Sequence, residues 1–330
     1  ISRRRGGGRS RPGRISGLPR LLSVILVLIV SVTFWHYYVL VSSYEKNPPF
    51  LRTEAKAQHV PGTTDDEDPD DGVGDDDVPD HQTPTVVAYA ISLTGCGAGA
   101  GLTDGAAVLA HSIYSNSYPR LATSRYAAKM YALVHPDAKA CSDELRRLGY
   151  DIRVVPTPVR VEDIQGQFLR EHVANTGCCG EKEFIKLWAY DLMDHAIVVH
   201  LDLDYLVLRP LDDLYDVMVA GRDGKRLLRD KIRAGKIQVH DGPWSEKYFE
   251  EGAQDGPVDA YFTRDYNMAH HGKKQAGVQG GFLVLRPSHP AFEEYVALIR
   301  KGDFLPGKGW GGIGGAFYGA QQFQGVVPYF

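Results

Sequence analysis

Cysteine is scarce in this sequence, with only four among 330 residues, and no Cys-x-x-Cys pair occurs. Four cysteines are too few for a fold held together mainly by disulfides, and without such a pair nothing suggests a structural zinc site. The adjacent Cys178 and Cys179 could each pair elsewhere in an oxidising compartment or lie as thiols in a loop. The sequence also has no Asn-x-Ser/Thr acceptor, so it gives no sign of N-glycosylation.

A strong excess of one charge sign is absent as well. The formal net charge is −4, and from residue 85 onward basic and acidic side chains nearly balance. A domain without a basic excess gives no electrostatic reason to bind nucleic acid, and we exclude that partner. No internal repeat occurs at the periods typical of solenoids.

The first 84 residues lack the periodicity of a globular core and fall into three segments. Residues 1–20 are rich in Arg and contain no acid, which is typical of a cytoplasmic tail. Residues 21–42 are almost entirely apolar, and about 20 such residues are enough to cross a bilayer as a helix. Residues 43–84 are acidic and rich in Pro, and they cannot bury enough apolar surface to fold, so we expect a disordered stem.

This order of segments predicts a single-pass type II membrane protein of the secretory pathway. The positive-inside rule keeps residues 1–20 in the cytosol and places everything after the span in the lumen, with residues 21–42 in the lipid bilayer. A cleavable signal peptide would need a shorter apolar run and a better cleavage site. The chain begins with Ile1 and ends at Phe330 within an apolar run, so we expect a fragment that is open at both ends.

Residues 85–330 are expected to form the folded domain, because strand and helix patterns alternate along its first half. Such alternation predicts right-handed crossovers and a doubly wound α/β fold with a mostly parallel sheet. The expected strands cover residues 86–92, 129–134, 151–155 and 196–201, and the expected helices cover 106–113, 142–149 and 181–193. Ser142 is the expected N-cap of the second helix.

Two carboxylates, Asp202 and Asp204, directly follow the apolar run 196–201. Ligands of such sheets bind beyond the carboxyl ends of the strands. Unpaired buried carboxylates are costly, and a divalent cation between the two would offset that cost. Their hard oxygen atoms favour Mg²⁺ or Mn²⁺, and such an ion could also bind a diphosphate leaving group. A solvated Asp-rich turn is the alternative without a ligand.

In three segments the sequence resembles the glycogenin-like family 8 retaining glycosyltransferases, which have the GT-A type of fold. Residues 184–216 resemble that family in a helix with Lys186, a strand, an Asp-x-Asp pair and an apolar run that ends in paired Asp. Residues 277–288 resemble its strand opened by an amide, here Gln279. Residues 324–329, which begin with Gln324, are a weaker match to its Asp-Gln-Gly helix start. The three matches occur in the family's order.

The resemblance implies a metal-dependent transfer of a sugar from a UDP-sugar to a glycan or protein acceptor, with Golgi location by analogy. Asp202 and Asp204 would hold Mn²⁺ or Mg²⁺ against the diphosphate. Lys186 would reach the phosphate or the sugar, although an ordinary surface Lys has the same pattern. The remaining implied contacts are with the uridine, from Ala90, Ile91 and Ser92, and with the sugar, from Gln279 and Gln324.

Several features depart from the family. Phe323 stands where the family has Asp, and the metal-binding His and phosphate-binding Lys would lie beyond residue 330. The Gly-rich residues 95–101 and the segment 223–276 look like insertions, and the resemblance does not account for either.

Three other readings remain open. Gly95, Gly97 and Ala100 fit a dinucleotide-binding loop, but the acid expected about 20 residues later is missing, which favours a surface loop. Asp202 could be the nucleophile of a haloacid-dehalogenase-type phosphatase, but that motif should stand near the domain start, with Thr or Val in place of Leu206. A non-catalytic membrane protein that binds sugar nucleotides is the third reading, and Phe323 supports it.

Overall fold

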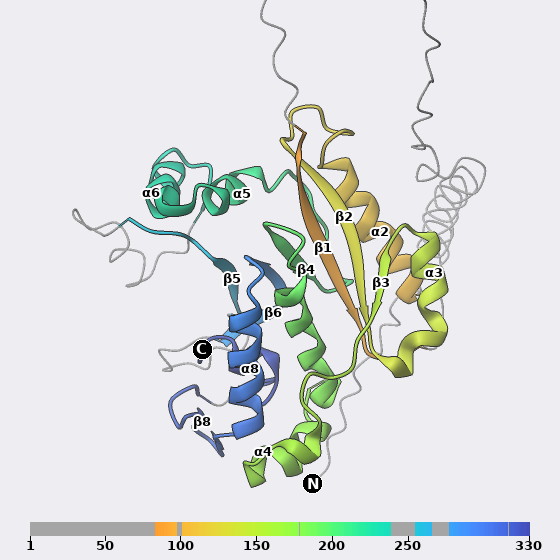
Figure 1. Ribbon diagram of the computed structural model, residues 1–330, viewed down its shortest axis with the longest axis vertical. Coiled ribbons are helices and arrows are strands. Elements are labelled where there is room, and N and C mark those ends of the chain that lie inside the picture. The colour runs from red at the N-terminus through yellow and green to blue at the C-terminus, as the bar shows by residue number, and fades with distance from the viewer. Residues whose placement is uncertain (1–82, 98–100, 178, 239–254, 266–276, 316) are drawn as a thin grey trace, which may run out of the picture. The chain divides into compact units, whose positions relative to one another are not determined.

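The structure is a computed structural model of the chain (Figure 1), and it describes residues 83–97, 101–177, 179–238, 255–265, 277–315 and 317–330. The predicted tail, the predicted anchor and nearly all of the predicted stem lie outside these ranges. Within them, no helix has both the length and the apolar character needed to span a bilayer. The first strand begins at Thr85, where the folded domain was predicted to begin.

The core of the described chain is a six-stranded sheet in the order β3-β2-β1-β4-β6-β5. Its strands are β1 (Thr85–Leu93), β2 (Tyr126–Val134), β3 (Asp151–Val154), β4 (Val198–Leu201), β5 (Ala260–Asp265) and β6 (Gly277–Leu285). The first four strands are mutually parallel, whereas β6 runs antiparallel to both β4 and β5. The prediction of an α/β fold with a mostly parallel sheet is therefore confirmed.

Strand β1 lies at the centre of this sheet and is covered on both faces. Its residues from Val87 to Ile91 are all buried, and such a continuous apolar run is typical of a strand with no face toward water. On one face, Ala88 and Ala90 belong to the main hydrophobic cluster. On the other face, the hydroxyl of Tyr89 lies 2.5 Å from that of Tyr215.

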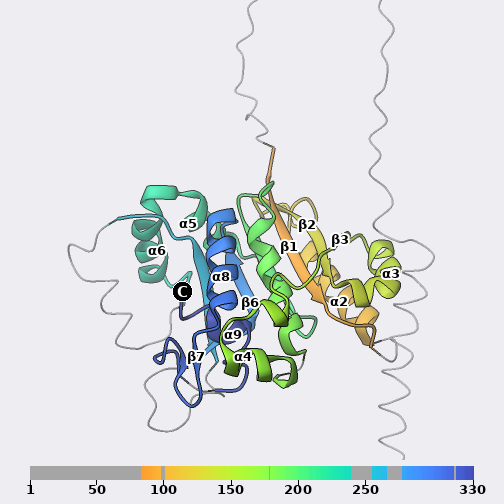
Figure 2. The same cartoon turned by 60° about the horizontal axis from the view of Figure 1, so that its bottom comes forward.

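Helices pack on both faces of the sheet (Figures 1 and 2). The face toward the main cluster carries η4, α8 and α9, and the opposite face carries α2 and α5. The α-helices are α2 (Gly101–Ser115), α3 (Ser142–Arg147), α4 (Gln167–His172), α5 (Asp212–Val219), α6 (Gly224–Arg233), α8 (His289–Lys301) and α9 (Phe323–Val326). A long 3₁₀ helix, η4, covers Gly180–Asp191. The short strands β7 (Phe304–Leu305) and β8 (Gly309–Trp310) form a separate hairpin.

The structure corrects several details of the helix predictions. The helix expected over 181–193 is a 3₁₀ helix, η4, and α2 is longer than the expected segment 106–113. Ser142 does not cap α3: its hydroxyl donates instead to the carbonyl of Lys139 at 2.8 Å. The segment 223–276, for which the sequence offered no account, contributes α6 and β5.

A disulfide joins Cys96 to Cys141, with 5.9 Å between their Cα atoms. It ties the loop after β1 to the residue before α3, two segments separated by 45 positions. Sequence reasoning considered pairing only for Cys178 and Cys179, because they are adjacent, and missed this bond. Cys178 lies outside the described residues.

Candidate active site

Asp202 follows the carboxyl end of β4 and keeps the register of the sheet. Its backbone N–H donates to the carbonyl of Gly281 on β6 at 3.0 Å. The chain then turns, and Tyr205 N–H donates to the carbonyl of Asp202 at 3.3 Å. This turn leaves Asp204 exposed beside the half-buried Asp202, so both predicted ligands lie where the ligands of such sheets bind.

Lys186 reaches this edge of the sheet from η4, although only 6% of its surface is exposed. Its Nζ atom lies 3.0 Å from Asp202 Oδ1 and 2.5 Å from Glu183 Oε1. The same amine donates to the carbonyl of Gly280 at 3.1 Å. The three N–H groups of the ammonium thus meet two carboxylates and one carbonyl, which matches its donor capacity.

The charges of this cluster determine its protonation. Burial alone would lower the pKa of Lys186, but the charges of Glu183 and Asp202 raise that pKa above its ordinary value. Burial raises the pKa of Asp202, and the charge of Lys186 opposes that rise. One ammonium against the carboxylates of Glu183, Asp202 and Asp204 leaves the site net negative, which favours an added cation.

Two amide side chains lie beside the carboxylates. Gln324 Nε2, at the start of α9, donates to Gln279 Oε1 on β6 at 3.1 Å, and that oxygen also accepts from the N–H of Gly281 at 3.3 Å. The structure therefore brings together two predicted residues that are 45 positions apart in the chain. Within the described part of the chain, Gln279 Nε2 and Gln324 Oε1 form no hydrogen bond, so both atoms are candidates to bind a ligand.

Glycine is required where β6 passes this cluster. A Cβ atom on Gly281 would lie 2.8 Å from Asp202 Oδ2 and 2.7 Å from the ring of Tyr205. A Cβ atom on Gly280 would lie 2.9 Å from Gln324 Cγ. All three distances are shorter than real Cβ contacts, so the two glycines allow β6 to lie against Asp202, Tyr205 and Gln324 without displacing their side chains.

The end of β1 is the predicted uridine site. Ala90 and Ile91 are each 1% exposed, so their side chains belong to the core. Ser92 Oγ lies 2.7 Å from Nε2 of His200, a fully buried residue whose pKa burial lowers well below its ordinary value. The imidazole is therefore neutral, and its Nδ1 atom has no hydrogen-bond partner among the described residues. The role of these three residues in binding uridine stays a prediction.

The carboxylates of the site determine which metal ion it could hold. No group of three or more His, Cys, Asp or Glu side chains that could hold an ion occurs in the described part of the chain. Asp202 and Asp204 together supply two carboxylate ligands. Mg²⁺ in phosphate-transfer sites is commonly held by one or two carboxylates together with phosphate oxygens and water, so this donor set fits a hard cation that binds with a diphosphate.

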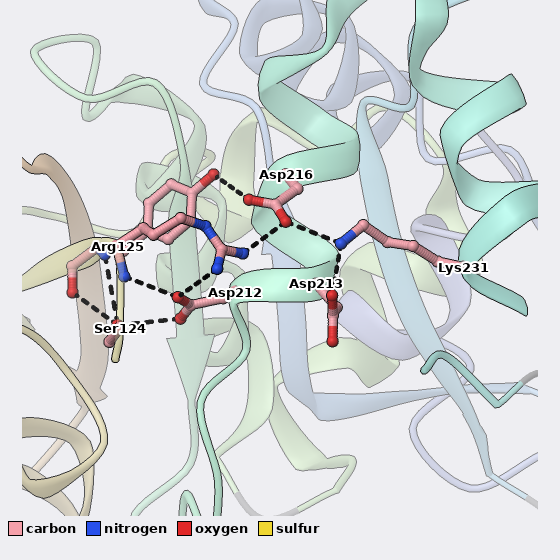
Figure 3. Close-up of polar contacts among 7 residues, drawn as sticks. Ser124, Arg125, Asp212, Asp213, Asp216 and Lys231 are labelled. Carbon is pink, nitrogen blue, oxygen red and sulfur yellow. Dashed lines mark hydrogen bonds and ion pairs between the residues drawn. The ribbon is translucent and has the colours of Figure 1, made fainter. Parts of the chain in front are cut away.

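The paired Asp212 and Asp213 lie outside this site and have a structural role (Figure 3). Asp212, at the start of α5, is buried and accepts from the backbone N–H of Arg125 at 2.8 Å and from Ser124 Oγ at 3.0 Å. Asp213 forms an ion pair with Lys231 of α6 at 2.5 Å. These contacts join α5 to the start of β2 and to α6.

Sequence reasoning missed Glu183 and made no prediction about the surroundings of Phe323. Glu183 stands three residues before Lys186, a helical spacing that indicates an ion pair and could have identified it. Phe323 is fully buried in the main cluster, so this position, where the glycogenin-like pattern has Asp, contributes core packing here. The next residue, Gln324, faces the site instead.

The sequence matches no known family description and no curated protein. Among solved structures, mouse xyloside xylosyltransferase 1 in its apo form aligns with 64% of this chain and 72% of its own, at 11% identity and a TM-score of 0.32. The apo WbbM bifunctional glycosyltransferase aligns at 14% identity and a TM-score of 0.31, over 68% of this chain and 35% of its own.

A third solved structure, the apo form of the glycosyltransferase GlyE of Streptococcus pneumoniae TIGR4, aligns at 12% identity and a TM-score of 0.29. The alignment covers 67% of this chain and 39% of that one. TM-scores this low transfer no property to this protein. The described residues themselves show a mostly parallel α/β sheet with a polar cluster at one edge.

Proposed function

We propose that this protein is a metal-dependent retaining glycosyltransferase of the glycogenin-like type, which transfers a sugar from a UDP-sugar to a glycan or protein acceptor. The observation that carries the proposal is the meeting of four separate chain segments, η4, the turn after β4, β6 and α9, at the carboxyl end of β4. They bring together Lys186, the pair Asp202 and Asp204, and the amides Gln279 and Gln324. A strand that merely ended in a solvated turn would not gather these groups.

The residues present divide the work of such a transfer. Asp202 and Asp204 would hold Mn²⁺ or Mg²⁺, which supplies positive charge where the UDP departs. Lys186 holds the carboxylate of Asp202 in place and adds one more positive charge to the diphosphate side of the site. Gln279 and Gln324 would donate to and accept from sugar hydroxyls, which orients the donor for attack by the acceptor.

The location in the cell is proposed from two independent features. A disulfide such as Cys96–Cys141 persists in oxidising compartments, which favours a lumenal domain. Residues 21–42 would anchor that domain as a type II membrane protein of the secretory pathway, with the Golgi as its site by analogy.

Calorimetric titration of UDP with and without Mn²⁺ tests the proposal. We expect wild-type protein to bind UDP only with the metal and Asp204→Asn to lose that binding, because the exposed Asp204 carboxylate has no other role in the described structure. Asp194→Asn, a change at another exposed Asp, is the matched control and should bind as wild type does. Equal UDP binding by Asp204→Asn and wild type would refute the metal assignment, and no binding by wild type would refute the transferase.

A further inference from the structure

A pocket of about 390 Å³ lies next to the candidate active site, and nothing above gives it a role. Two segments form most of its lining: Asn175, Thr176 and Gly177 just before η4, and residues 317–321 just before α9. Phe168 of α4, Phe304 of β7, Pro306 and Gly307 complete the lining. The volume lies within the range of about 300–1,000 Å³ that is typical of small-molecule sites.

The chemistry of the lining is aromatic and uncharged. Four aromatic rings line the pocket, from Phe168, Phe304, Phe317 and Tyr318, together with the amides of Asn175 and Gln321. Among the described residues, no Asp, Glu, Lys, Arg or His belongs to the lining. A nucleotide or an acidic peptide would find no cation here. A ligand with apolar ring faces and neutral hydroxyl groups would find both aromatic surface and hydrogen-bonding amides.

One atom at this lining lacks a partner. Oε1 of Gln321 is shielded from solvent and accepts no hydrogen bond within the described residues. An acceptor left unpaired in this way is costly, and a ligand hydroxyl would recover that cost if the amide of Gln321, which lines the pocket, rotated toward it. The neighbouring Gln322 is 2% exposed and fully engaged, because its Nε2 donates to the carbonyls of Thr176 and Gly180 at 2.8 and 2.6 Å.

Those two bonds fix the pocket to the active site. Gln322 joins the wall at Thr176 to the start of η4, the helix that carries Lys186 six residues later. The opposite wall at Gly319 approaches the side chain of Gln324, which contacts Gln279. Both walls of the pocket are therefore continuous with elements that form the donor site.

We propose that this pocket binds a neutral saccharide residue of the acceptor, which makes the acceptor a glycan. Tyr318, which is 59% exposed, and Phe317 would face the sugar ring, and the amide of Gln321 would rotate toward the pocket to bond one of the sugar hydroxyls. This inference rests on the proposed function, since a saccharide beside the amide pair would be the group that receives the transferred sugar.

Saturation-transfer NMR on the full chain tests the pocket. The sample contains UDP with Mg²⁺ in place of Mn²⁺. The probes are the neutral methyl β-glycosides of glucose, galactose and xylose, with methyl glucuronide and a Ser-containing peptide as contrasting ligands. We expect at least one neutral glycoside to bind, and Tyr318→Ala and Gln321→Leu each to weaken that binding at least tenfold. Met193→Ala removes an exposed apolar side chain outside the pocket and should have no effect.

UDP titration of the same preparations separates the two proposals. Tyr318→Ala and Gln321→Leu should retain UDP affinity, which also shows that they are folded. Wild type that binds UDP but no neutral glycoside overturns the pocket assignment alone, and so does glycoside binding that both variants retain. Peptide binding that both variants lose would overturn the glycan acceptor. If wild type binds a glycoside but not UDP, and both variants weaken the glycoside binding, the saccharide pocket is retained and the transferase proposal is overturned.

Discussion

Lys186 is the residue on which the electrostatics of the site depend. The side chain of Lys186 is 7% exposed, and its ammonium lies between the carboxylates of Glu183, whose side chain is 11% exposed, and of the partly exposed Asp202. In water such a pair contributes little, but inside a protein the loss of one partner leaves an uncompensated buried charge. The same contact that orients Asp202 for a metal therefore also stabilises the fold around η4.

Replacing Lys186 with Met should lower the free energy of unfolding by about 3–5 kcal/mol, because Glu183 and Asp202 would lose the ammonium that they share. Adding Glu183→Gln to that variant should recover part of the loss, since the second change removes one of the two negative charges that Lys186 balances. Urea unfolding of the wild type, both single variants and the double variant measures the coupling. Strictly additive losses would show that the two side chains do not interact as the structure indicates.

At the scale of elements, β6 supplies the surface against which Asp202 is placed. Its Gly280 carbonyl accepts from Lys186, and its Gly281 carbonyl accepts from the N–H of Asp202. The strand can approach this closely only because neither residue has a side chain. Gly has no side chain to pack in a strand, and it loses more conformational freedom on folding than other residues do. These two glycines therefore lower the stability of the folded state.

Gly281→Ala should weaken metal-dependent UDP binding at least tenfold and lower the free energy of unfolding by about 1–3 kcal/mol, because its Cβ would displace Asp202 and Tyr205. Calorimetry and thermal unfolding measure the two effects. Gly256→Ala is the matched control, since the nearest atom to its Cβ would lie at an ordinary 3.5 Å. Unchanged UDP affinity in Gly281→Ala would contradict the placement of Asp202 beside this strand.

Helix α5 is held to its neighbours by a second group of charges (Figure 3). Asp216 accepts from Arg125 at 2.6 Å, from the hydroxyl of Tyr126 at 2.9 Å and from Lys231 at 2.8 Å. Burial would raise the pKa of Asp216, but the hydrogen bonds from Lys231, Tyr126 and Arg125 hold that pKa below its ordinary value. The folded state therefore binds the proton of this carboxyl less readily than the unfolded chain does.

This linkage has a definite sign. The stabilisation from Asp216 is complete above the ordinary pKa of an Asp, about 3.9, and is lost as the pH falls through the lower pKa of the folded state. Asp216→Asn should destabilise the protein at pH 7 and make its stability fall less steeply between about pH 4 and pH 2. Denaturant unfolding across that range measures the slope, with Asp230→Asn on the exposed side of α6 as the control. An unchanged slope would rule out this role.

For the whole described domain, the disulfide is the one covalent link between distant segments. It closes a loop across 45 positions, from the end of β1 to the start of α3. A cross-link of this length lowers the entropy of the unfolded chain, and the expected stabilisation is about 3–4 kcal/mol.

The double variant Cys96→Ser/Cys141→Ser should lose that amount in an unfolding titration. Reductant should cause a similar loss in wild-type protein and no further loss in the variant, which separates the bond from other effects of the substitutions. Wild-type stability that is the same with and without reductant would show that the bond is not formed in solution.

Local patterns in the sequence were sufficient for the α/β class and for most of the parallel strands. Residues 87–91 are apolar and buried because a central parallel strand has no face toward water, and 196–201, which are apolar except for His200, repeat that pattern just before Asp202. The expected helix at 181–193 was located correctly, but its 3₁₀ form was not anticipated, since that form depends on how η4 packs against β4 and α8.

Tertiary structure alone decided which of the candidate residues meet. Gln279 and Gln324 touch because β6 runs antiparallel beside β4 and α9 packs against β6, and neither contact leaves a local trace in the sequence. Phe323 is buried for the same reason. A sequence determines what each segment prefers by itself, whereas contacts between segments far apart depend on how buried faces fit together. That fit placed the amide pair, the two carboxylates and Lys186 at one edge of the sheet.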